Sequence, residues 1–383
     1  MKQRNYFYTI LTIIQCVLGM RVIWRLLRSA GGTSIRAEDA QSIVGDERVT
    51  VLVPVLNEYE RLAPCLEGLM RQGQEVAEIL VIDGGSTDGT QELVTRYMQR
   101  DARMRLVDAA PIPDDWNGKA WGMQVGLQAM RVDAAWILTI DADVRPKEQL
   151  TRALLGKACV DRLAALSIAT KQEVGSVGEG LLHPALLTTL VYRFGMPNRI
   201  FRQLHDVQAS GQCFLVQRAV LDVFDGFAAV RHSVCEDVTL ARLIVRTGHR
   251  VGFYEAENLV SVRMYANWRE TWQNWTRSLP LRDQFSGLST LIGLLEVVFI
   301  QASPPLLIAM ILLTQRRQYR LMMVNCVLAT LRIGVLFGTA RAYSPRPWSY
   351  WLSPLCDFPV AIQLMRMAVR RTYTWRGRVI HRG

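Results

Sequence analysis

The chain has 383 residues, of which 50% are hydrophobic and 21% are charged, and its formal net charge is +11. The basic excess is uneven: residues 49–283 carry 26 basic and 28 acidic residues, whereas residues 284–383 carry 12 and 2. A near-neutral central region beside a basic, apolar C-terminal region argues against binding to nucleic acid and indicates a soluble domain joined to membrane segments.

An apolar run lies near the N-terminus, at residues 6–20, with basic residues on both sides. No small-residue cleavage site precedes the arginines that follow it, so a signal peptide is the weaker interpretation. We expect residues 1–28 to be a retained membrane anchor. Residues 29–48 are small and polar, which predicts a linker.

Strand and helix patterns then alternate along the chain. We expect strands near 49–54, 78–83, 104–107, 136–140 and 163–170, and helices near 58–72, 89–100, 119–131 and 179–195. Runs rich in β-branched residues, separated by segments of helix length, are typical of an open, mostly parallel sheet. The sequence therefore predicts an α/β domain over residues 49–283.

Carboxylates follow three of the predicted strands. Glu58 comes after the first strand, Asp83 ends the second, and Asp141 and Asp143 follow the strand at 136–140. Ligands of open α/β sheets bind outside the carboxyl ends of the strands, where these acids would gather. Two aspartates separated by one residue offer hard oxygens suited to Mg²⁺ or Mn²⁺, an ion that commonly bridges to substrate phosphates.

Residues 284–383 contain three apolar runs, and the candidate spans are 289–313, 321–339 and 348–365. If all three crossed the membrane and the soluble domain were cytoplasmic, the tail from Arg366 to Arg382 would face outward, against the positive-inside rule, and so would Arg316, Arg317 and Arg320. Polar residues, Pro304 and Pro305 interrupt the first run. We therefore expect that run to form a bent re-entrant or interfacial hairpin.

Residues 53–58 read Val-Pro-Val-Leu-Asn-Glu, and residues 81–90 read Val-Ile-Asp-Gly-Gly-Ser-Thr-Asp-Gly-Thr. Together they resemble the nucleotide-binding half of family 2 glycosyltransferases of the GT-A fold. The resemblance implies that Pro54, Glu58 and Asp83 hold the base and ribose of a nucleotide. The family more often has a second Asp where this chain has Gly84. Asp88 is interpreted equally well as a helix cap or as a ligand contact.

Asn117-Gly118-Lys119 comes just before a predicted helix. Unpaired amides at a helix start and a lysine can receive a diphosphate, and family members have Gly-Lys in this loop. The resemblance thus makes Lys119 a candidate diphosphate ligand. It also places Asp141 in contact with the donor and assigns the divalent ion, Mg²⁺ or Mn²⁺, to Asp141 and Asp143.

Residues 234–241, Val-Cys-Glu-Asp-Val-Thr-Leu-Ala, resemble the Glu-Asp motif that begins a helix in this family. The resemblance implies that Asp237, with Glu236 beside it, is the catalytic base that takes the proton of an acceptor hydroxyl. A single displacement of this kind inverts the anomeric centre. Acids at a helix start also act as caps, and that alternative stays open.

Residues 268–277 stand where many membrane members of the family carry Gln-x-x-Arg-Trp. The match fails, because Gln273 is followed by Asn-Trp-Thr-Arg, which argues against processive polymerisation. Arg277 is still a candidate contact of the diphosphate. Trp268, Trp272 and Trp275 fall on one helix face, where packing or an interfacial lid is a better interpretation than a sugar platform.

The resemblance covers residues 49–283 and implies a metal-dependent, inverting hexosyltransferase with a UDP- or GDP-hexose donor. The anchor and the C-terminal membrane region most resemble bacterial enzymes that glycosylate polyisoprenoid lipids, including hopanoid-associated and cyanobacterial carotenoid (myxol-type) glycosyltransferases. We therefore expect an integral membrane protein that transfers one hexose to the hydroxyl of a membrane isoprenoid, first of all a carotenoid, at the cytoplasmic face.

Three alternatives stay open. In one alternative the acceptor is a polyprenyl phosphate, whose attack needs less help from a catalytic base. In another the acceptor is a hopanoid or a sphingolipid. Outside enzymology, the chain is a catalytically inactive membrane scaffold that keeps the sugar-nucleotide fold. The acids at 83, 141, 143 and 237 favour an enzyme.

Overall fold

The computed structural model describes residues 2–42, 47–277, 279, 287–314, 318–370, 372–375 and 378–381. The chain forms two compact units. One, which we call the sheet unit, consists of Gly31–Gln172 and Pro197–Met264. The other, the helical unit, consists of Met1–Ala30, Glu173–Met196 and Tyr265–Gly383.

The sheet unit is built on a large sheet. Its strands are β1 (Val49–Val55), β2 (Val76–Asp83), β3 (Met104–Asp108), β4 (Trp136–Ile140), β6 (Ala165–Ala169), β8 (Arg199–Phe201), β9 (Cys213–Gln217) and β10 (Val251–Glu255). They lie in the order β3-β2-β1-β4-β9-β6-β10-β8. β3, β2, β1 and β4 are mutually parallel, as are β6 and β10, whereas β9 and β8 run antiparallel to their neighbours. This confirms the predicted α/β fold with a mostly parallel sheet.

A smaller sheet in the same unit joins β5 (Val144–Pro146), β11 (Val260–Val262) and β7 (Lys171–Gln172). The helices of the unit are α2 (Tyr59–Met70), α3 (Thr90–Met98), α4 (Gly118–Gln128), α5 (Leu150–Asp161), α7 (Arg218–Asp222) and α8 (Glu236–Arg246), with 3-10 turns η1 (Ala37–Ser42), η2 (Leu204–Asp206) and η3 (Ala228–Val230).

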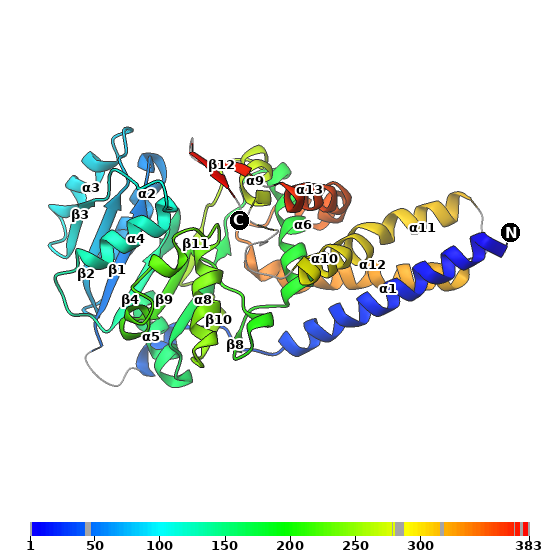
Figure 1. Cartoon of the computed structure of the whole chain (residues 1–383), viewed down its shortest axis with the longest axis horizontal. Helices are drawn as coiled ribbons and strands as arrows, with labels where there is room; N and C mark the ends of the chain where they lie inside the picture. The colour runs from blue at the N-terminus through cyan, green and yellow to red at the C-terminus, as the bar shows by residue number, and fades with distance from the viewer. Residues whose placement is uncertain are drawn as a thin grey trace. The chain divides into compact units, whose positions relative to one another are not determined.

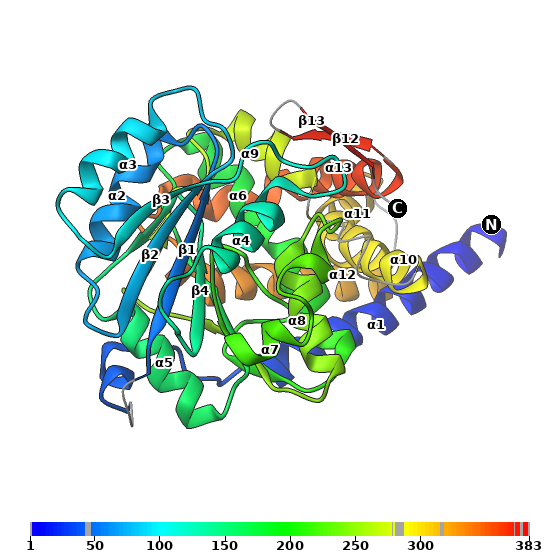
Figure 2. The ribbon, with the colours of Figure 1, turned by 60° about the vertical axis from the view of Figure 1, so that its left-hand side comes forward.

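Side chains of β1 point alternately to the two faces of the large sheet, and a different helix covers each face. Val51 and Val53 belong to the main core together with Leu66 of α2. Leu52 points to the opposite face, where a β-carbon on Gly126 of α4 would lie 3.1 Å from its side chain. The glycine lets α4 lie close to β1 and β2 (Figure 2). Because every residue of a strand covered on both faces is apolar, the run Val-Thr-Val-Leu-Val could be recognised as a strand.

The predicted strands and helices of this unit are present, with boundaries that differ by a few residues. Helix α5 is an additional element that the sequence analysis did not predict. It is largely buried through Leu150, Leu154 and Leu155, so its apolar residues are spread around the helix and give no clear amphipathic period.

The helical unit contains α1 (Lys2–Ser29), α6 (Val177–Phe194), α9 (Trp268–Asn274), η4 (Trp275–Arg277), α10 (Gly287–Glu296), the π-helix η6 (Val297–Ala302), α11 (Ser303–Leu313), α12 (Tyr319–Thr339), η7 (Ala340–Ala342), η8 (Trp348–Cys356), α13 (Asp357–Val369), β12 (Thr372–Trp375) and β13 (Arg378–His381). Among the described residues, three helical runs are long and apolar enough to cross a membrane: Tyr6–Ser29, Gly287–Leu313 and Tyr319–Ala342. They lie side by side (Figure 1).

Two expectations for the C-terminal region are wrong. The segment 289–313 is not a hairpin: it is one continuous helical run, because Pro304 and Pro305 fall in the first turn of α11, where a missing N–H costs little. The segment 348–365 is not one apolar helix, because it divides into the 3-10 helix η8 and α13.

Candidate active site at the carboxyl ends of the strands

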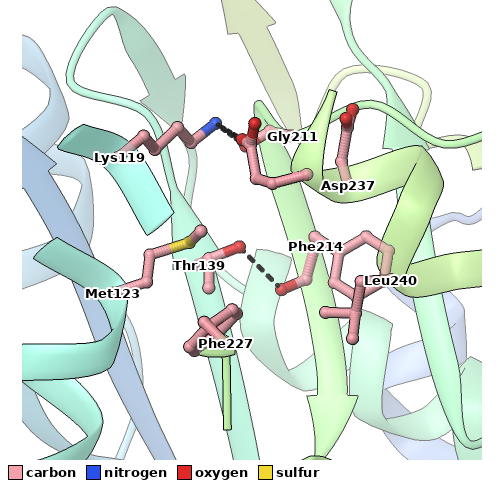
Figure 3. Close-up of a pocket in the computed structure, with 9 residues that line it drawn as sticks. Lys119, Met123, Thr139, Gly211, Phe214, Phe227, Asp237 and Leu240 are labelled. Carbon is pink, nitrogen blue, oxygen red and sulfur yellow. Dashed lines mark hydrogen bonds and ion pairs between the residues drawn. The ribbon is translucent and has the colours of Figure 1, made fainter. Parts of the chain in front are cut away.

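The ammonium group of Lys119, in the first turn of α4, joins two of the acidic motifs. Its Nζ lies 2.6 Å from Asp141 Oδ1 and 3.0 Å from Glu236 Oε1. It also donates a hydrogen bond of 3.1 Å to the carbonyl oxygen of Gly211 (Figure 3). Asp237 follows Glu236 in the first turn of α8. The structure therefore brings Lys119, Asp141, Glu236 and Asp237 together, as the sequence predicted.

Asn117 is the reason why the starts of α4 and α8 lie so close. As the N-cap of α4, its Oδ1 accepts from the backbone N–H of Lys119 at 3.1 Å. Its Nδ2 donates to Ser233 O at 2.9 Å, and its own N–H donates to Arg231 O at 2.6 Å. The loop before α8 is thus tied to the turn before α4.

Gly211 is a site residue that the sequence analysis missed. A β-carbon at this position would lie 2.6 Å from Lys119 Nζ and 3.2 Å from Glu236 Oε1. Only glycine leaves the lysine in this place without displacement. The one signal in the sequence is a glycine two residues before the segment that forms β9, and a glycine does not say what approaches it.

A small pocket lies next to these charged groups. Lys119, Gly211, Glu236 and Asp237 line it on the polar side, and its other lining residues are Met123, Thr139, Phe214, Phe227 and Leu240. Figure 3 shows Lys119 and Asp237 on either side of Gly211, with the apolar side chains below them. The sequence analysis did not identify this apolar wall, since such residues are indistinguishable from core residues in a sequence.

The site has more carboxylates than positive charges, and the pKa values of two of these carboxylates are raised. Burial, reinforced by the charge of Glu236, raises the pKa of Asp237 to about 7, although Lys119 opposes the shift. Burial and the charge of Asp141 raise the pKa of Asp143 to about 7. Burial alone would lower the pKa of Lys119, but Asp141, Glu236 and Asp237 raise it above its ordinary value. Two carboxyl groups of this site therefore titrate near neutral pH.

Asp141 and Asp143 fit a divalent cation. Asp143 is half-buried, and its Oδ1, which is shielded from solvent, accepts no hydrogen bond from any residue that the structure describes. The described residues include no group of three or more His, Cys, Asp and Glu side chains arranged around a metal position. Two carboxylates nevertheless suffice for Mg²⁺, which takes its other ligands from water and from substrate phosphates.

The predicted nucleotide-binding residues lie at the ends of β1 and β2 and make contacts within their own loops. Asp83 is buried and accepts from the backbone N–H groups of Gly85 and Ser86 at 3.2 and 3.0 Å and from Gln91 Nε2 at 2.6 Å. Glu58 forms an ion pair of 2.8 Å with Arg61. Pro54 packs under α4, where a β-carbon on Gly122 would lie 3.3 Å away. The role of Pro54, Glu58 and Asp83 toward a base and ribose stays a prediction.

Asp88 acts as a cap. Its Oδ2 accepts from the N–H of Tyr59 at 3.0 Å and its Oδ1 from the N–H of Thr90 at 3.1 Å, and these are the first residues of α2 and α3. Of the two interpretations left open for Asp88, the structure therefore supports helix capping.

The tryptophans at 268, 272 and 275 belong to the helical unit. Trp272 and Trp275 pack against an apolar core that includes Leu182 and Leu186, and the ring of His183 lies 4.3 Å from that of Trp275. These contacts confirm packing as the function of Trp272 and Trp275. The side chain of Arg277 lies outside the described residues, so its contact with a diphosphate stays a prediction.

Comparison with known proteins finds similarity in sequence and in fold to glycosyltransferases. Residues 50–225 match the family described as Glycosyl transferase family 2. The fold is similar to that of the mannosyltransferase PcManGT from Pyrobaculum calidifontis, whose structure was solved with GDP-Man and Mn²⁺. The TM-score is 0.51 at 17% identity, over 93% of this chain and 99% of that one.

Two relatives are similar in sequence. Glycosyltransferase GlyG of Streptococcus pneumoniae serotype 4 is 28% identical over 108 residues, which is 28% of this chain and 34% of the relative. The 4,4'-diaponeurosporenoate glycosyltransferase of Staphylococcus haemolyticus is 22% identical over 236 residues, which is 61% of this chain and 62% of the relative. The chain thus spans about a third of the first relative and less than two thirds of the second.

Proposed function

We propose that the protein is an inverting, metal-dependent hexosyltransferase that moves one hexose from a nucleotide sugar to the hydroxyl of a membrane isoprenoid lipid, foremost a carotenoid. The observation that carries this proposal is the link made by Lys119 between Asp141 of the metal motif and Glu236 beside Asp237. This arrangement suits a reaction in which a diphosphate leaves on one side while an acceptor hydroxyl loses its proton on the other.

On the donor side, Asp141 and Asp143 would hold Mg²⁺ or Mn²⁺. When bound, such an ion acts as a Lewis acid and stabilises the negative charge of a departing nucleoside diphosphate. Lys119, at the N-terminal turn of α4, adds a second positive charge and the favourable end of the helix dipole. Pro54, Glu58 and Asp83 would position the nucleoside of UDP or GDP, and Arg277 would reach the diphosphate.

On the acceptor side, Asp237 would take the proton of the hydroxyl that attacks the anomeric carbon. A pKa of about 7 is suited to a base that works near neutral pH. Glu236 keeps Lys119 in place through its 3.0 Å ion pair and so acts on the site as a positioning residue. Because no covalent intermediate is needed, the transfer inverts the anomeric configuration.

Two observations favour a lipid acceptor. The helical unit has three runs of membrane-spanning length within the described residues, which brings the chain to the bilayer. The relative from Staphylococcus haemolyticus, by its name, glycosylates 4,4'-diaponeurosporenoate, a carotenoid acid, and it matches more of this chain than GlyG does. We therefore rank a carotenoid before a hopanoid, a sphingolipid or a polyprenyl phosphate.

The distribution of arginines supports a cytoplasmic site. If the three runs cross and 348–365 does not, the segment after residue 342 lies on the same side of the membrane as the sheet unit. That segment carries seven arginines and one acid, Asp357. Placing it in the cytoplasm obeys the positive-inside rule for this segment, whereas Arg316 and Arg317, between the second and third runs, face the other side.

The test is a transfer assay on membranes that contain the full chain. Membranes receive a radiolabelled UDP- or GDP-hexose, Mn²⁺ and a carotenoid with a free hydroxyl, and the organic phase is extracted and counted. The proposal predicts label in an organic-soluble product that survives mild acid, which cleaves sugar–phosphate bonds faster than glycosides. Label only in a polyprenyl-phosphate product would favour the alternative acceptor, and no donor turnover would favour the scaffold.

A further inference from the structure

Among the buried polar side chains that the structure describes in the helical unit, two clusters differ in whether all their hydrogen-bonding groups have partners. The first is the pair of Gln15 on α1 and Asn325 on α12. Gln15 Nε2 donates to Asn325 Oδ1 at 2.9 Å, and Asn325 Nδ2 donates back to Gln15 Oε1 at 3.0 Å. The second hydrogen of Gln15 Nε2 faces both Phe299 O and Ser303 Oγ, and the second hydrogen of Asn325 Nδ2 is donated to Leu321 O. This pair is closed: both oxygens and both nitrogens have partners, and its function is to join helices.

The second cluster is formed by Gln301 on η6, Arg332 on α12 and Asp357 at the start of α13. Arg332 Nε and Nη2 donate to the two oxygens of Asp357 at 2.8 and 3.0 Å. Gln301 Nε2 donates to Asp357 Oδ1 at 2.7 Å and to Ala185 O at 2.9 Å. The exposed fractions of the three residues are 1%, 3% and 1%. Ionisable groups among apolar membrane helices are costly and commonly mark functional sites.

Unlike the first cluster, this one is open. Gln301 Oε1 and Arg332 Nη1 have no hydrogen-bond partner among the residues that the structure describes. The orientation of the amide is fixed, since both groups facing Gln301 Nε2, Ala185 O and Asp357 Oδ1, are acceptors. The unpaired groups are therefore one acceptor, Gln301 Oε1, and the two N–H groups of Arg332 Nη1. The two side chains are neighbours, because both donate a hydrogen bond to Asp357 Oδ1.

The backbone that carries Gln301 is also irregular. Val297–Ala302 form a π-helix between α10 and α11. Single π-helical turns inside longer helices are rare and occur frequently at functional sites. This turn places Gln301 against Ala185 of α6 and Asp357 of α13.

The net charge of the cluster, which is zero, indicates which class of ligand it can bind. Arg332 is already neutralised by both oxygens of Asp357, so an added phosphate or carboxylate would meet an uncompensated carboxylate and the lone pairs of Gln301. An ether or ketone accepts a hydrogen bond but cannot donate one to Gln301 Oε1. An alcohol does both: it donates to Gln301 Oε1 and accepts from Arg332 Nη1.

We propose that Gln301 and Arg332 bind the alcohol group of a membrane lipid inside the helical unit. The three runs of membrane-spanning length in this unit would bring it into the bilayer, so we take the alcohol to be that of a lipid. The site is separate from Asp237 and the acidic residues of the sheet unit and needs no nucleotide sugar. Its failure in the test below would leave the proposed transfer reaction standing.

The experiment uses the full chain in lipid nanodiscs without nucleotide or metal. The probe is geranylgeraniol carrying a diazirine in its chain, and two matched probes end in a methyl ether and in a monophosphate. We expect saturable photolabelling by the alcohol, mapped to the peptides around Gln301 and Arg332, and labelling at least about tenfold weaker with either matched probe, the effect of losing one or two hydrogen bonds.

Variants separate binding from stability. Gln301→Met, of similar length, and Arg332→Lys, which keeps a cation opposite Asp357, should each weaken alcohol labelling about tenfold. Asn325→Leu opens the closed pair in the same unit and should keep alcohol labelling within about twofold, although it lowers stability. Elution as a single species on size exclusion establishes that each variant is folded.

Each other outcome overturns the proposal. Equal labelling by the ether or the phosphate contradicts alcohol recognition, and undiminished labelling of Gln301→Met contradicts this location. If no probe labels these peptides in the folded protein, the cluster is occupied by water. If Asn325→Leu weakens labelling as much as Gln301→Met does, the effect is one of helix packing and not of binding.

Discussion

Each unit buries a basic side chain against carboxylates, but the two arrangements differ in charge balance. In the sheet unit, Lys119 faces Asp141 and Glu236, with Asp143 and Asp237 close by. In the helical unit, Arg332 faces Asp357 alone. The first cluster keeps an excess of negative charge, and the second is neutral.

The difference in net charge determines which kind of ligand each cluster can bind. An excess of buried carboxylates raises the pKa of Asp143 and Asp237 to about 7 and is relieved by a cation or by protons. A neutral ion pair with unsatisfied hydrogen-bonding groups is stabilised by an uncharged polar ligand, which supplies the missing hydrogen bonds without adding charge. Substitutions and pH should therefore affect the two clusters in different ways, which makes the comparison testable.

The largest effect is expected from Asp237→Asn. Asn has the same shape but cannot take a proton, so transfer to a hydroxyl acceptor should fall by about 10³-fold while donor binding stays within about threefold. Single-turnover transfer and nucleotide titration measure the two quantities. Asp133→Asn, an exposed acid in the same unit, serves as control and should keep full activity. A fall of less than about tenfold would instead favour a phosphate acceptor, which needs little help from a base.

The next effect concerns the metal. Asp143→Asn removes one of two carboxylate ligands, so affinity for Mn²⁺ should fall at least about 100-fold, as measured by calorimetry in the presence of the nucleoside diphosphate. Gln301→Met, in the neutral cluster, is the matched control and should bind Mn²⁺ like the wild type. Equal affinity of Asp143→Asn and wild type would remove residue 143 from the metal site.

A third prediction concerns pH. Below its pKa of about 7, Asp237 is protonated and cannot accept a proton, so kcat/KM should fall about tenfold per pH unit below neutrality and level off above it. Stability should change in the opposite direction. Because the folded state binds protons at Asp143 and Asp237 that the unfolded chain releases near pH 4, the free energy of unfolding should decrease as pH rises from about 4 to 7.

Urea denaturation with a chelator present measures the stability side of this prediction. The double variant Asp143→Asn, Asp237→Asn should lose most of the decrease between pH 4 and 7. A kcat/KM that does not change across this range would show that a different group limits the reaction.

A feature could be predicted from the sequence when the residues that form it are close together in the chain. It could not be predicted when the contacting residues are far apart in the chain. The strands that lead to Asp83 and Asp141 could be predicted because burial on both faces makes a strand mostly apolar and leaves its polar end conspicuous. The contact of Asp88 with Thr90 was likewise local, whereas its contact with Tyr59 arises from the fold. The partners of Lys119 could only be guessed through the resemblance, since Asp141 and Glu236 reach it through the fold.

The remaining features left no signal of their own in the sequence. The wall formed by Met123, Phe214 and Phe227 consists of residues that are equally typical of a core. Arg332 and Asp357 are isolated charges in two apolar runs, and the sequence does not say that they pair. The run through Pro304 was misjudged because a proline breaks a helix in its interior but not in its first turn.

The smallest effect is expected from Gly211→Ala. The added methyl group would lie 2.6 Å from Lys119 Nζ, and the flexible lysine should move away and lose its ion pair with Asp141. We expect transfer to fall about tenfold with a loss of stability near 1 kcal/mol, since a partly solvated ion pair contributes little to folding. Gly334→Ala, where the new β-carbon meets nothing within 4 Å, is the control.

A double-variant cycle decides whether this effect passes through the lysine. If Gly211→Ala acts by displacing Lys119, adding it to Lys119→Met should cause no further loss, and the coupling free energy should equal the effect of Gly211→Ala alone. Independent, additive losses would mean that Gly211 is needed for the backbone of its own turn. In that case the link between the metal motif and the base motif would not depend on the space that this glycine leaves.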